Sequence, residues 1–395
     1  MPSEKKRKTE GEVYPIFAKK SKASIEGASN DRLDAEDGDS ELDVGAKLSA
    51  LREILDFSGV DSEEEISRRF ERISTALLQE FRLVVRRENV TDDEFEILEA
   101  EFYLQIGGCH EDPFTHGNEE QRVSGRWYFH RAPMFSKDSR RSLTSTSQYR
   151  GGSRKGMDLT FGGPRILPSA STSSQERLLR GGILLRSVRK VNDGQVTSGP
   201  SLLVDKILST SAASGIQELV DDKWGKNTSA FFSEGESPAT CLFLKPVNPN
   251  KKPPTIYFSP RIGLDLSHPG TTGHGTVPLH PRIQFLPRRY RFFVHPEWLT
   301  ANGRSQTFLG VLGPFVSSSS SYSAGLKKSS LAKSIAGLTG IKEVTAAKYL
   351  GDYVAGREAG LQLIDSFIGE KGKGASSSPA TYLKMMGALS NMESR

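Results

Sequence analysis

The stretch FEILEAEFYLQIGGCHEDPFTHG, residues 95–117, decides the expected fold because it predicts one long strand followed by an acidic turn. Side chains along a strand alternate between its two faces, so residues two positions apart point the same way. Glu99 and Glu101 are therefore expected on one face, together with Tyr103 and the apolar Phe95 and Ile97. Two carboxylates on an otherwise apolar face indicate either a buried ion pair or a catalytic acid.

Further short strands are expected after this stretch, the first three of them bounded by glycine. They are RWYFH (126–130), GMDLTFG (156–162), GGILLRSVRKV (181–191), TIYFSPRIGLDL (255–266) and RRYRFFVHPEW (288–298). Before it, helical spacing begins near Leu42, and a second helix is expected with Asp61 or Ser62 as its N-cap. Its expected apolar face is Ile66, Phe70, Ile73, Leu77 and Phe81. A helix start is also expected at SGPSLLVDKIL (198–208), capped by Ser198 or Ser201.

These elements predict an α+β fold with a curved, mainly antiparallel sheet and flanking helices. The sheet domain is expected over 42–310, with a helical N-terminal part at 42–90. A disordered, polar arm (1–41) should precede it. A Ser-rich linker (316–330) and a helical tail (331–395) should follow. The Ser-rich stretches 136–148 and 169–176 are expected to be mobile.

Composition limits the class of protein. The chain has 395 residues, 36% of them hydrophobic, and a formal net charge of +5, which permits a nucleic acid as partner. Its two cysteines, Cys109 and Cys241, predict no disulfide framework. No run of 18 apolar residues predicts a membrane span, and the charged start does not resemble a secretory signal.

The N-terminal arm resembles a bipartite nuclear import signal. Basic clusters flank a ten-residue spacer: Lys5, Lys6, Arg7 and Lys8, then Lys19, Lys20 and Lys22. We therefore expect a nuclear import receptor as partner and the nucleus as location; the alternative is a solvated basic tail. The apolar spacer residues Tyr14–Phe17 are a candidate contact with the replication clamp.

Residues 122–155 form the most basic block, and aromatic residues are interleaved with its arginines. Cations beside flat rings suit phosphates and unstacked bases. The expected DNA-binding residues are Arg131, Arg150, Arg154 and Lys155, with Arg288 and Arg289 as a second cluster. The alternative is a solvated loop over a core strand.

A zinc site is the less favoured interpretation of Cys109, His110, His116 and His130. Their spacing fits no common zinc finger, and no second cysteine pair lies near them. A polar pocket residue or a hydrogen-bonded structural histidine is the favoured role for His116, and no metal is expected.

Short blocks over about residues 95–300 occur in the order found in the alkyladenine (3-methyladenine, N-methylpurine) DNA glycosylases, and the chain resembles that family. EAEFYL (99–104) is similar to its strand Glu-x-Glu-Ala-Tyr, and EDPFTH (111–116) to its acidic turn ending in His. SGRWYFHR, MDLTFG, GILLRSVRKV, SGPSLLVDKIL, SPRIGL and RRYRFFV resemble the later blocks.

The resemblance implies a monofunctional DNA repair glycosylase that acts on damaged double-stranded DNA without cofactor. Glu101 would activate the water that attacks the sugar C1′, and Arg186 would orient that carboxylate or water. Tyr103, His116 and Tyr128 would hold the extruded alkylated or deaminated purine. Base release without strand cleavage is expected.

Two departures from the family bear on the activity. Asp158 stands where the family has a pocket Asn, and an acid beside Glu101 would raise a pKa. The long basic insert 131–155 replaces the hairpin tip whose Tyr wedges into DNA, with Phe135 and Tyr149 as candidate wedges. A non-catalytic or RNA-directed nucleic-acid-binding protein on the same fold is therefore the alternative function, and a structural Glu–Arg pair with Arg186 is the alternative role for the two acids.

Overall fold

The computed structural model describes residues 41–135, 142–163, 178–233, 235, 237–248, 252–273, 275–299, 302–317, 328–372 and 374–392. The chain divides into two compact units, Met1–Ser40 and Glu41–Arg395, and only the second has described residues. The basic clusters 5–8 and 19–22, the segment Tyr14–Phe17 and linker residues 318–327 lie outside these ranges. No helix in the described ranges is both long and apolar enough to cross a lipid bilayer.

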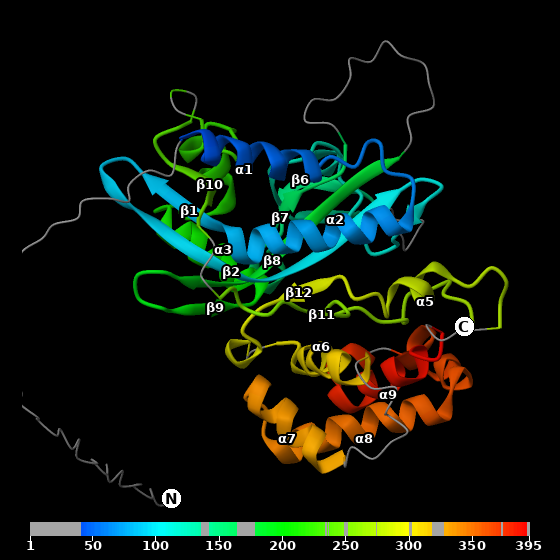
Figure 1. Cartoon of the computed structure of the whole chain (residues 1–395). Helices are drawn as coiled ribbons and strands as arrows, with labels where there is room; N and C mark the ends of the chain where they lie inside the picture. The colour runs from blue at the N-terminus through cyan, green and yellow to red at the C-terminus, as the bar shows by residue number, and fades with distance from the viewer. Residues whose placement is uncertain are drawn as a thin grey trace, which may run out of the picture. The chain divides into compact units, whose positions relative to one another are not determined.

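A curled antiparallel sheet forms the centre of the second unit (Figure 1). Its main strands lie in the order β10–β1–β2–β8–β7–β4. Their bounds are β1 (Phe81–Arg87), β2 (Val90–Ile106), β4 (Trp127–Phe129), β7 (Met157–Thr160), β8 (Leu179–Lys190) and β10 (Cys241–Pro246). Helices flank this sheet, so the predicted α+β class is confirmed.

The strand that carries the two acids lies in the middle of the sheet. β2 pairs with β8 along most of its length and with β1 near its N-terminal end. Its Glu99–Glu101 segment also pairs with β12 (Arg291–Phe293), which continues to β11 (Tyr257–Ser259). The short β3 (His110–Glu111) pairs with β2, and β9 (Val196–Ser198) with β8. Neighbouring strands therefore enclose Glu99 and Glu101 on both sides.

Two β-bulges interrupt the pairing of β2 with β8 beside these acids. Ile97 pairs with Val188 and Glu99 with Ser187, so Leu98 is an extra residue in β2. Ala100 pairs with Leu185, so Arg186 is an extra residue in β8. A bulge re-aims the side chain at which it occurs. The uniform alternation expected from Phe95 to Tyr103 is therefore wrong at Leu98.

Two helices precede the sheet, α1 (Glu41–Ile54) and α2 (Glu63–Thr75). The Ser62 hydroxyl caps α2 by accepting a hydrogen bond from the Glu65 N–H, which confirms one of the two predicted caps. The helix was expected to continue through Phe81, but after a π-helical turn (Ala76–Glu80) the chain enters β1 at Phe81. The prediction of a helical segment over 42–90 is wrong from Phe81 onward, because residues such as Val84 and Val85 pair with β10.

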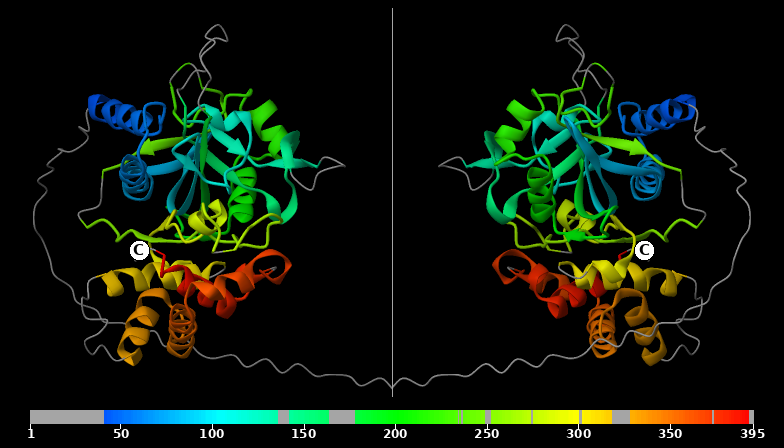
Figure 2. Two further views of the ribbon diagram at one scale, coloured as in Figure 1. Left: turned by 90° about the vertical axis from the view of Figure 1, so that its right-hand side faces the viewer. Right: turned by 90° about the vertical axis from the view of Figure 1, so that its left-hand side faces the viewer.

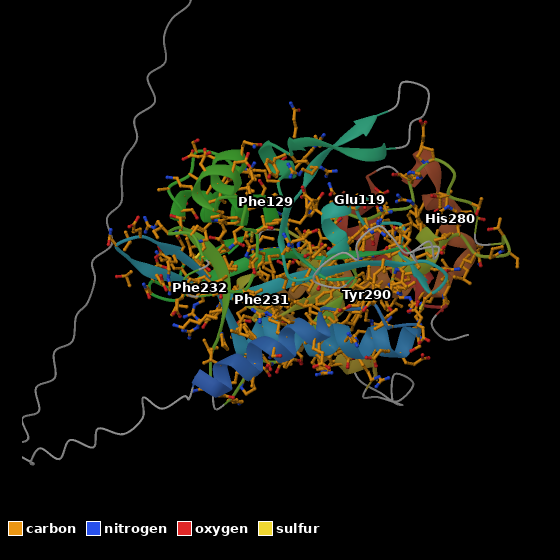
Figure 3. The ribbon with its side chains drawn as sticks, turned by 90° about the horizontal axis from the view of Figure 1, so that it is seen from above. Glu119, Phe129, Phe231, Phe232, His280 and Tyr290 are labelled. Atoms are coloured by element: carbon orange, nitrogen blue, oxygen red, sulfur yellow. The ribbon has the colours of Figure 1, made fainter. Side chains whose placement is uncertain are left out.

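The sheet separates an apolar core from a polar face. Phe102 of β2 lies 4.8 Å from Phe70 of α2 between ring centroids, and Phe161 packs 5.8 Å away. The views in Figure 2 show α1 and α2 on one side of the sheet and β6 and α3 toward the other. Figure 3 likewise places Phe129 and Glu119 away from α1 and α2, with Tyr290 nearer α2. Residues that alternate with Phe102, such as Glu101 and Tyr103, face away from this core.

The basic insert forms a separate two-stranded hairpin, β5 (Arg131–Phe135) with β6 (Ser142–Tyr149). Residues 142–148 were expected to be mobile, but they are paired as a strand. The expected Ser-rich stretch 169–176 lies outside the described residues.

The helix α3 (Pro200–Thr210) begins at Gly199 rather than at either predicted serine cap. Gly199 has a φ of +118°, in the region that only glycine adopts readily, and Pro200 takes the first helical position. Two short helices follow, α4 (Ile216–Glu218) and α5 (Pro281–Phe285).

The C-terminal helices build a second apolar core below β11 and β12 (Figure 1). They are α6 (Arg304–Ser317), α7 (Lys328–Thr339), α8 (Glu343–Ala359) and α9 (Pro379–Leu389). The helical tail is confirmed as helical. The domain boundary expected at residue 310 is wrong because it falls inside α6, where Gly310 packs against Phe293 of β12.

Candidate active site

One row of paired residues crosses five strands and brings three of the predicted site residues to the polar face. Tyr128 pairs with Asp158, Asp158 with Leu184, Leu184 with Glu101, and Glu101 with Arg291. Directly paired residues of antiparallel strands project to the same face. Residues that are far apart in the sequence therefore share one surface of the sheet.

Glu101 is fully buried, and three donors hold its carboxylate. Oε2 accepts hydrogen bonds from the Tyr103 hydroxyl at 2.9 Å and from Arg186 at 3.1 Å. Oε1 accepts one from the Ile262 backbone N–H at 2.7 Å. A carboxylate oxygen has two lone pairs. Among the described residues Oε1 thus has one hydrogen-bond partner and Oε2 has two.

Glu99 is held by as many donors as Glu101, but two of its three donors are guanidinium groups. It accepts hydrogen bonds from Arg186 at 3.1 Å, from Arg291 at 2.6 Å and from the Ser187 hydroxyl at 2.5 Å. Burial alone would raise the pKa of Glu99, but Arg291 and Arg186 outweigh burial and hold the pKa below its usual range. Two carboxylates and two guanidinium groups thus form a buried network that balances its own charge.

Arg186 joins the two acids. Its Nε donates to Glu99 and its Nη1 to Glu101, a geometry that its position at the bulge in β8 makes possible. Burial opposes the charged form of Arg186, but Glu101 and Glu99 outweigh it and raise the pKa of the guanidinium. Arg186 therefore stays a cation beside both carboxylates, whether they act in catalysis or only in structure.

Tyr103 is half-buried, and its ring has a fixed plane. The Arg261 guanidinium lies 4.5 Å from the ring centroid and is itself held by both oxygens of Asp112. Burial, followed by the negative charge of Glu101, raises the pKa of the Tyr103 hydroxyl well above its usual value. The hydroxyl thus remains a donor to Glu101.

Asp158 belongs to a second polar group at the other end of the row. It accepts hydrogen bonds from Gln121 at 3.0 Å, and its other oxygen lies 2.9 Å from His130 Nε2. His116 packs its ring edge-on against His130, with centroids 4.4 Å apart. Strand β8 lies between Asp158 and Glu101, so the two acids are two strand spacings, roughly 10 Å, apart rather than adjacent as expected.

The two other predicted pocket residues lie at this group. Burial lowers the pKa of His116 to about 3, with smaller effects from His130 and Arg150, so its imidazole is neutral at pH 7. Tyr128 is 2% exposed, and burial raises the pKa of its hydroxyl above the usual range. The structure thus brings His116, Tyr128 and Asp158 together, and Tyr103 with Glu101 and Arg186.

The predicted DNA-binding residues are divided between two regions. Around the hairpin, Arg131 is 2.6 Å from Glu120 and stacks 3.8 Å from the Tyr149 ring, while Lys155 pairs with Asp205. Arg150 donates to the Arg131 carbonyl, and Arg154 is exposed. Arg288 lies 3.7 Å from Glu63 of α2, and Arg289 lies over Phe258 of β11. Acidic partners therefore offset part of the positive charge expected here.

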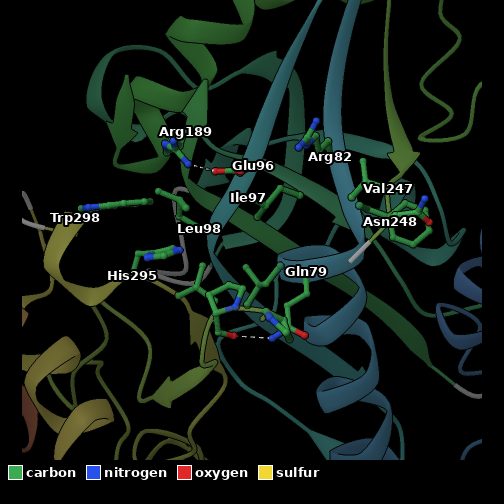
Figure 4. Close-up of a pocket in the computed structure, with 15 residues that line it drawn as sticks. Gln79, Arg82, Glu96, Ile97, Leu98, Arg189, Val247, Asn248, His295 and Trp298 are labelled. Carbon is green, nitrogen blue, oxygen red and sulfur yellow. Dashed lines mark hydrogen bonds and ion pairs between the residues drawn. The ribbon is translucent and has the colours of Figure 1, made fainter. Parts of the chain in front are cut away.

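A cavity of about 260 Å³ is lined by Glu96, Ile97 and Leu98 in the middle of β2 (Figure 4). His295 and Trp298 stack in its wall with ring centroids 4.0 Å apart. Arg189 and Glu96 pair with each other at 2.6 Å on the same wall. Its lining includes none of the residues predicted for the site.

Comparison with known proteins shows that the chain is similar to a viral protein. No family model matches the chain. The protein named "Uncharacterized protein L759" of Acanthamoeba polyphaga mimivirus is 30% identical over 171 residues, 43% of this chain and 69% of the viral protein. The chain belongs to the family of that viral protein. The viral protein's name states no activity.

Sequence reasoning missed the residues that reach the two acids from a distance. Arg291 is 192 positions from Glu99, and Ile262 is 161 positions from Glu101. Arg261 donates to the carbonyl of Phe102, next to Glu101, from 159 positions away. No local pattern joins these residues. The only available signal was that Arg261 and Arg291 lie in SPRIGL and RRYRFFV, two blocks of the family resemblance. His130 and Gln121 were missed as partners of Asp158 for the same reason.

Proposed function

We propose that the chain is a DNA glycosylase that hydrolyses the N-glycosidic bond of a damaged purine in double-stranded DNA, with the nucleus as its site of action. The observation that supports this most is the difference between the two acids. Both arginines of the network bind Glu99, whereas Glu101 is bound by one arginine, a backbone N–H and the hydroxyl of the half-buried Tyr103. The order of family-like blocks in the sequence supports the same reaction.

In the proposed reaction the nucleotide leaves the base stack, because C1′ is inaccessible inside a duplex. Glu101 Oε1 holds a water and takes its proton as the oxygen bonds to C1′. The C1′–N bond breaks, and the base leaves with the bonding electrons and gains a proton. Arg186 and Tyr103 hold the other carboxylate oxygen in place during this step.

One observation favours a second candidate, a non-catalytic or RNA-directed nucleic-acid-binding protein on the same fold. Glu101 is 0% exposed, and its network already balances its charge. A purely structural network would have the same properties. Under the proposed function the surroundings of Glu101 must therefore open when DNA binds.

The test measures released base from duplex oligonucleotides that carry one hypoxanthine or one ethenoadenine, and from methylated bulk DNA. Glu101→Gln should abolish release, because the amide cannot accept a proton. Arg186 loses one of its two carboxylates in this variant, so circular dichroism must first show that it folds, and the folded variant should keep DNA binding. Glu96→Gln, on the same strand and outside the network, is the matched control and should release base at the wild-type rate. Equal release by Glu101→Gln would remove Glu101 from the mechanism.

No release from any substrate, combined with salt-sensitive binding, would support the binding-protein candidate. Parallel binding to single-stranded RNA separates its two forms, since an RNA-directed protein should prefer that ligand to duplex DNA.

A further inference from the structure

The side chains of His116, His130 and Asp158 converge although they come from three separate segments. His116 lies in the loop after β3, His130 directly after β4, and Asp158 in β7. One potential ligand atom from each lies within 4.8 Å of the others. We propose that these three side chains bind a divalent transition-metal ion, and that Zn²⁺ suits them best.

The ligand set fits this class of metal. Two imidazole nitrogens and one carboxylate oxygen are ligands that Zn²⁺ accepts in a tetrahedral arrangement. Ligand atoms around a tetrahedral zinc lie roughly 3.4 Å apart, given metal–ligand distances of about 2.1 Å. His130 Nε2 and Asp158 Oδ1 are already 2.9 Å apart, so small rotations of the His116 and His130 rings would complete the geometry.

Gln121 orients the Asp158 carboxylate and also has a side-chain oxygen that accepts no hydrogen bond from the described residues. Gln121 is 1% exposed and donates from Nε2 to Asp158 Oδ2. Its Oε1 is buried and has no hydrogen-bond partner within the described part of the chain. Metal ligands are usually held by such outer partners. Three protein ligands leave one position open, and a water bound there could donate to this oxygen.

Two glycines leave the room that the ligands occupy. A Cβ at Gly156 would lie 2.5 Å from Cε1 of the His130 ring. A Cβ at Gly182 would lie 2.6 Å from Asp158 Oδ2 and 2.7 Å from Gln121 Nε2. Any larger residue would displace the ring or the carboxylate. The backbone of β8 and of the turn before β7 is thus packed closely around this group.

Charge permits a cation here. Asp158 supplies one negative charge to the cluster, and a neutral imidazole is the form of histidine that binds a metal. Arg150 is close enough to disfavour further positive charge on His116, so it opposes the metal. A single carboxylate against Arg150 predicts weaker binding than a site with several anionic ligands.

The experiment uses the full chain after treatment with a chelator and dialysis. Zn²⁺ is titrated in competition with a chromogenic chelator, and Co²⁺ is added separately to follow its visible absorption. We expect one equivalent of Zn²⁺ per chain and Co²⁺ bands typical of a tetrahedral site. Asp158→Asn and His116→Gln should each weaken Zn²⁺ binding by tenfold or more.

His295→Gln is the matched control, because His295 also pairs with a carboxylate, Glu297, at 3.2 Å, but lies outside the cluster. It should bind Zn²⁺ as the wild type does. Gln121→Ala keeps all three ligands and should weaken binding by about tenfold, in the range for an outer partner. This variant keeps the proposal testable if a ligand variant does not fold, which circular dichroism would show.

Two results would overturn the proposal: no stoichiometric uptake by the wild type, or equal uptake by the folded Asp158→Asn, His116→Gln and His295→Gln chains. Metal uptake is measured without DNA, so it does not depend on the proposed glycosylase. Base release measured with and without chelator then shows separately whether the ion affects that reaction.

Discussion

Glu99 and Glu101 are two residues apart, yet their surroundings give them different roles. Every donor near Glu99 is a fixed part of the sheet: Arg186, Ser187 and Arg291. Arg291 in turn donates to Ser259 and Thr307, which ties the network to β11 and α6. Removing a partner from such a buried network leaves uncompensated charge, which is strongly destabilising. Glu99 is therefore expected to act through stability.

Glu99→Gln should lower the free energy of unfolding by about 3–5 kcal/mol at pH 7, because Arg186 and Arg291 lose their shared anion. The pKa of Glu99 is lowered in the folded protein from its ordinary 4.5. Its stabilisation is thus present above the unfolded pKa and is lost as pH falls through the folded one. Urea unfolding from pH 7 to 3.5 should show the gap between wild type and variant narrowing below about pH 4.5.

Glu96→Gln is the control for this experiment. Its ion pair with Arg189 is about one-third exposed, so its loss should cost about 1 kcal/mol or less. A gap between wild type and Glu99→Gln that stays constant over the whole pH range would contradict the role assigned to Glu99.

At the scale of the element, local sequence patterns predicted those strands and helix starts that depend on contacts between residues close in sequence. The alternation of side chains predicted the strands β2 and β8. The acidic residues in the first turn of α2 indicated a helix start near Ser62. The bulges at Leu98 and Arg186 were not predictable, because they arise from the register between strands about 90 positions apart. The change from helix to strand at Phe81 also depends on pairing with the distant β10.

The α2 cap offers a test at this scale. Ser62→Ala should lower the free energy of unfolding by about 1 kcal/mol, because the Glu65 N–H at the start of α2 loses its acceptor. Ser67→Ala, at an exposed position inside the same helix, should be neutral or slightly stabilising. The measurement is urea unfolding at pH 7. Equal effects of the two substitutions would show that the hydroxyl of Ser62 does not cap the helix.

At the scale of the whole described unit, the C-terminal helices are coupled to the site rather than appended to it. Thr307 of α6 accepts a hydrogen bond from Arg291, the residue that also holds Glu99. The sequence predicted that these helices are separate from the sheet domain, because a Ser-rich linker precedes α7. Helix α6 precedes that linker in the sequence, and no local sequence pattern predicts its contacts with β11 and β12.

Gly310 of α6 is the point at which this coupling can be tested. A Cβ there would lie 2.7 Å from the ring of Phe293, which is fully buried and cannot move aside cheaply. Gly310→Ala should therefore cost about 1–3 kcal/mol. Gly337→Ala is the matched control in α7, where no atom lies within 4 Å of the new Cβ, and it should stabilise by up to about 1 kcal/mol.

The measurement follows urea unfolding by far-ultraviolet circular dichroism, which reports mainly on helices, and by tryptophan fluorescence. Trp127 and Trp224 lie in the core of the sheet. If α6 joins the two cores into one cooperative unit, Gly310→Ala should shift both transitions to lower urea by the same amount, since a strained contact weakens both sides. If only the helical signal moves, the C-terminal helices unfold independently, and they cannot hold Arg291 in place for the acids.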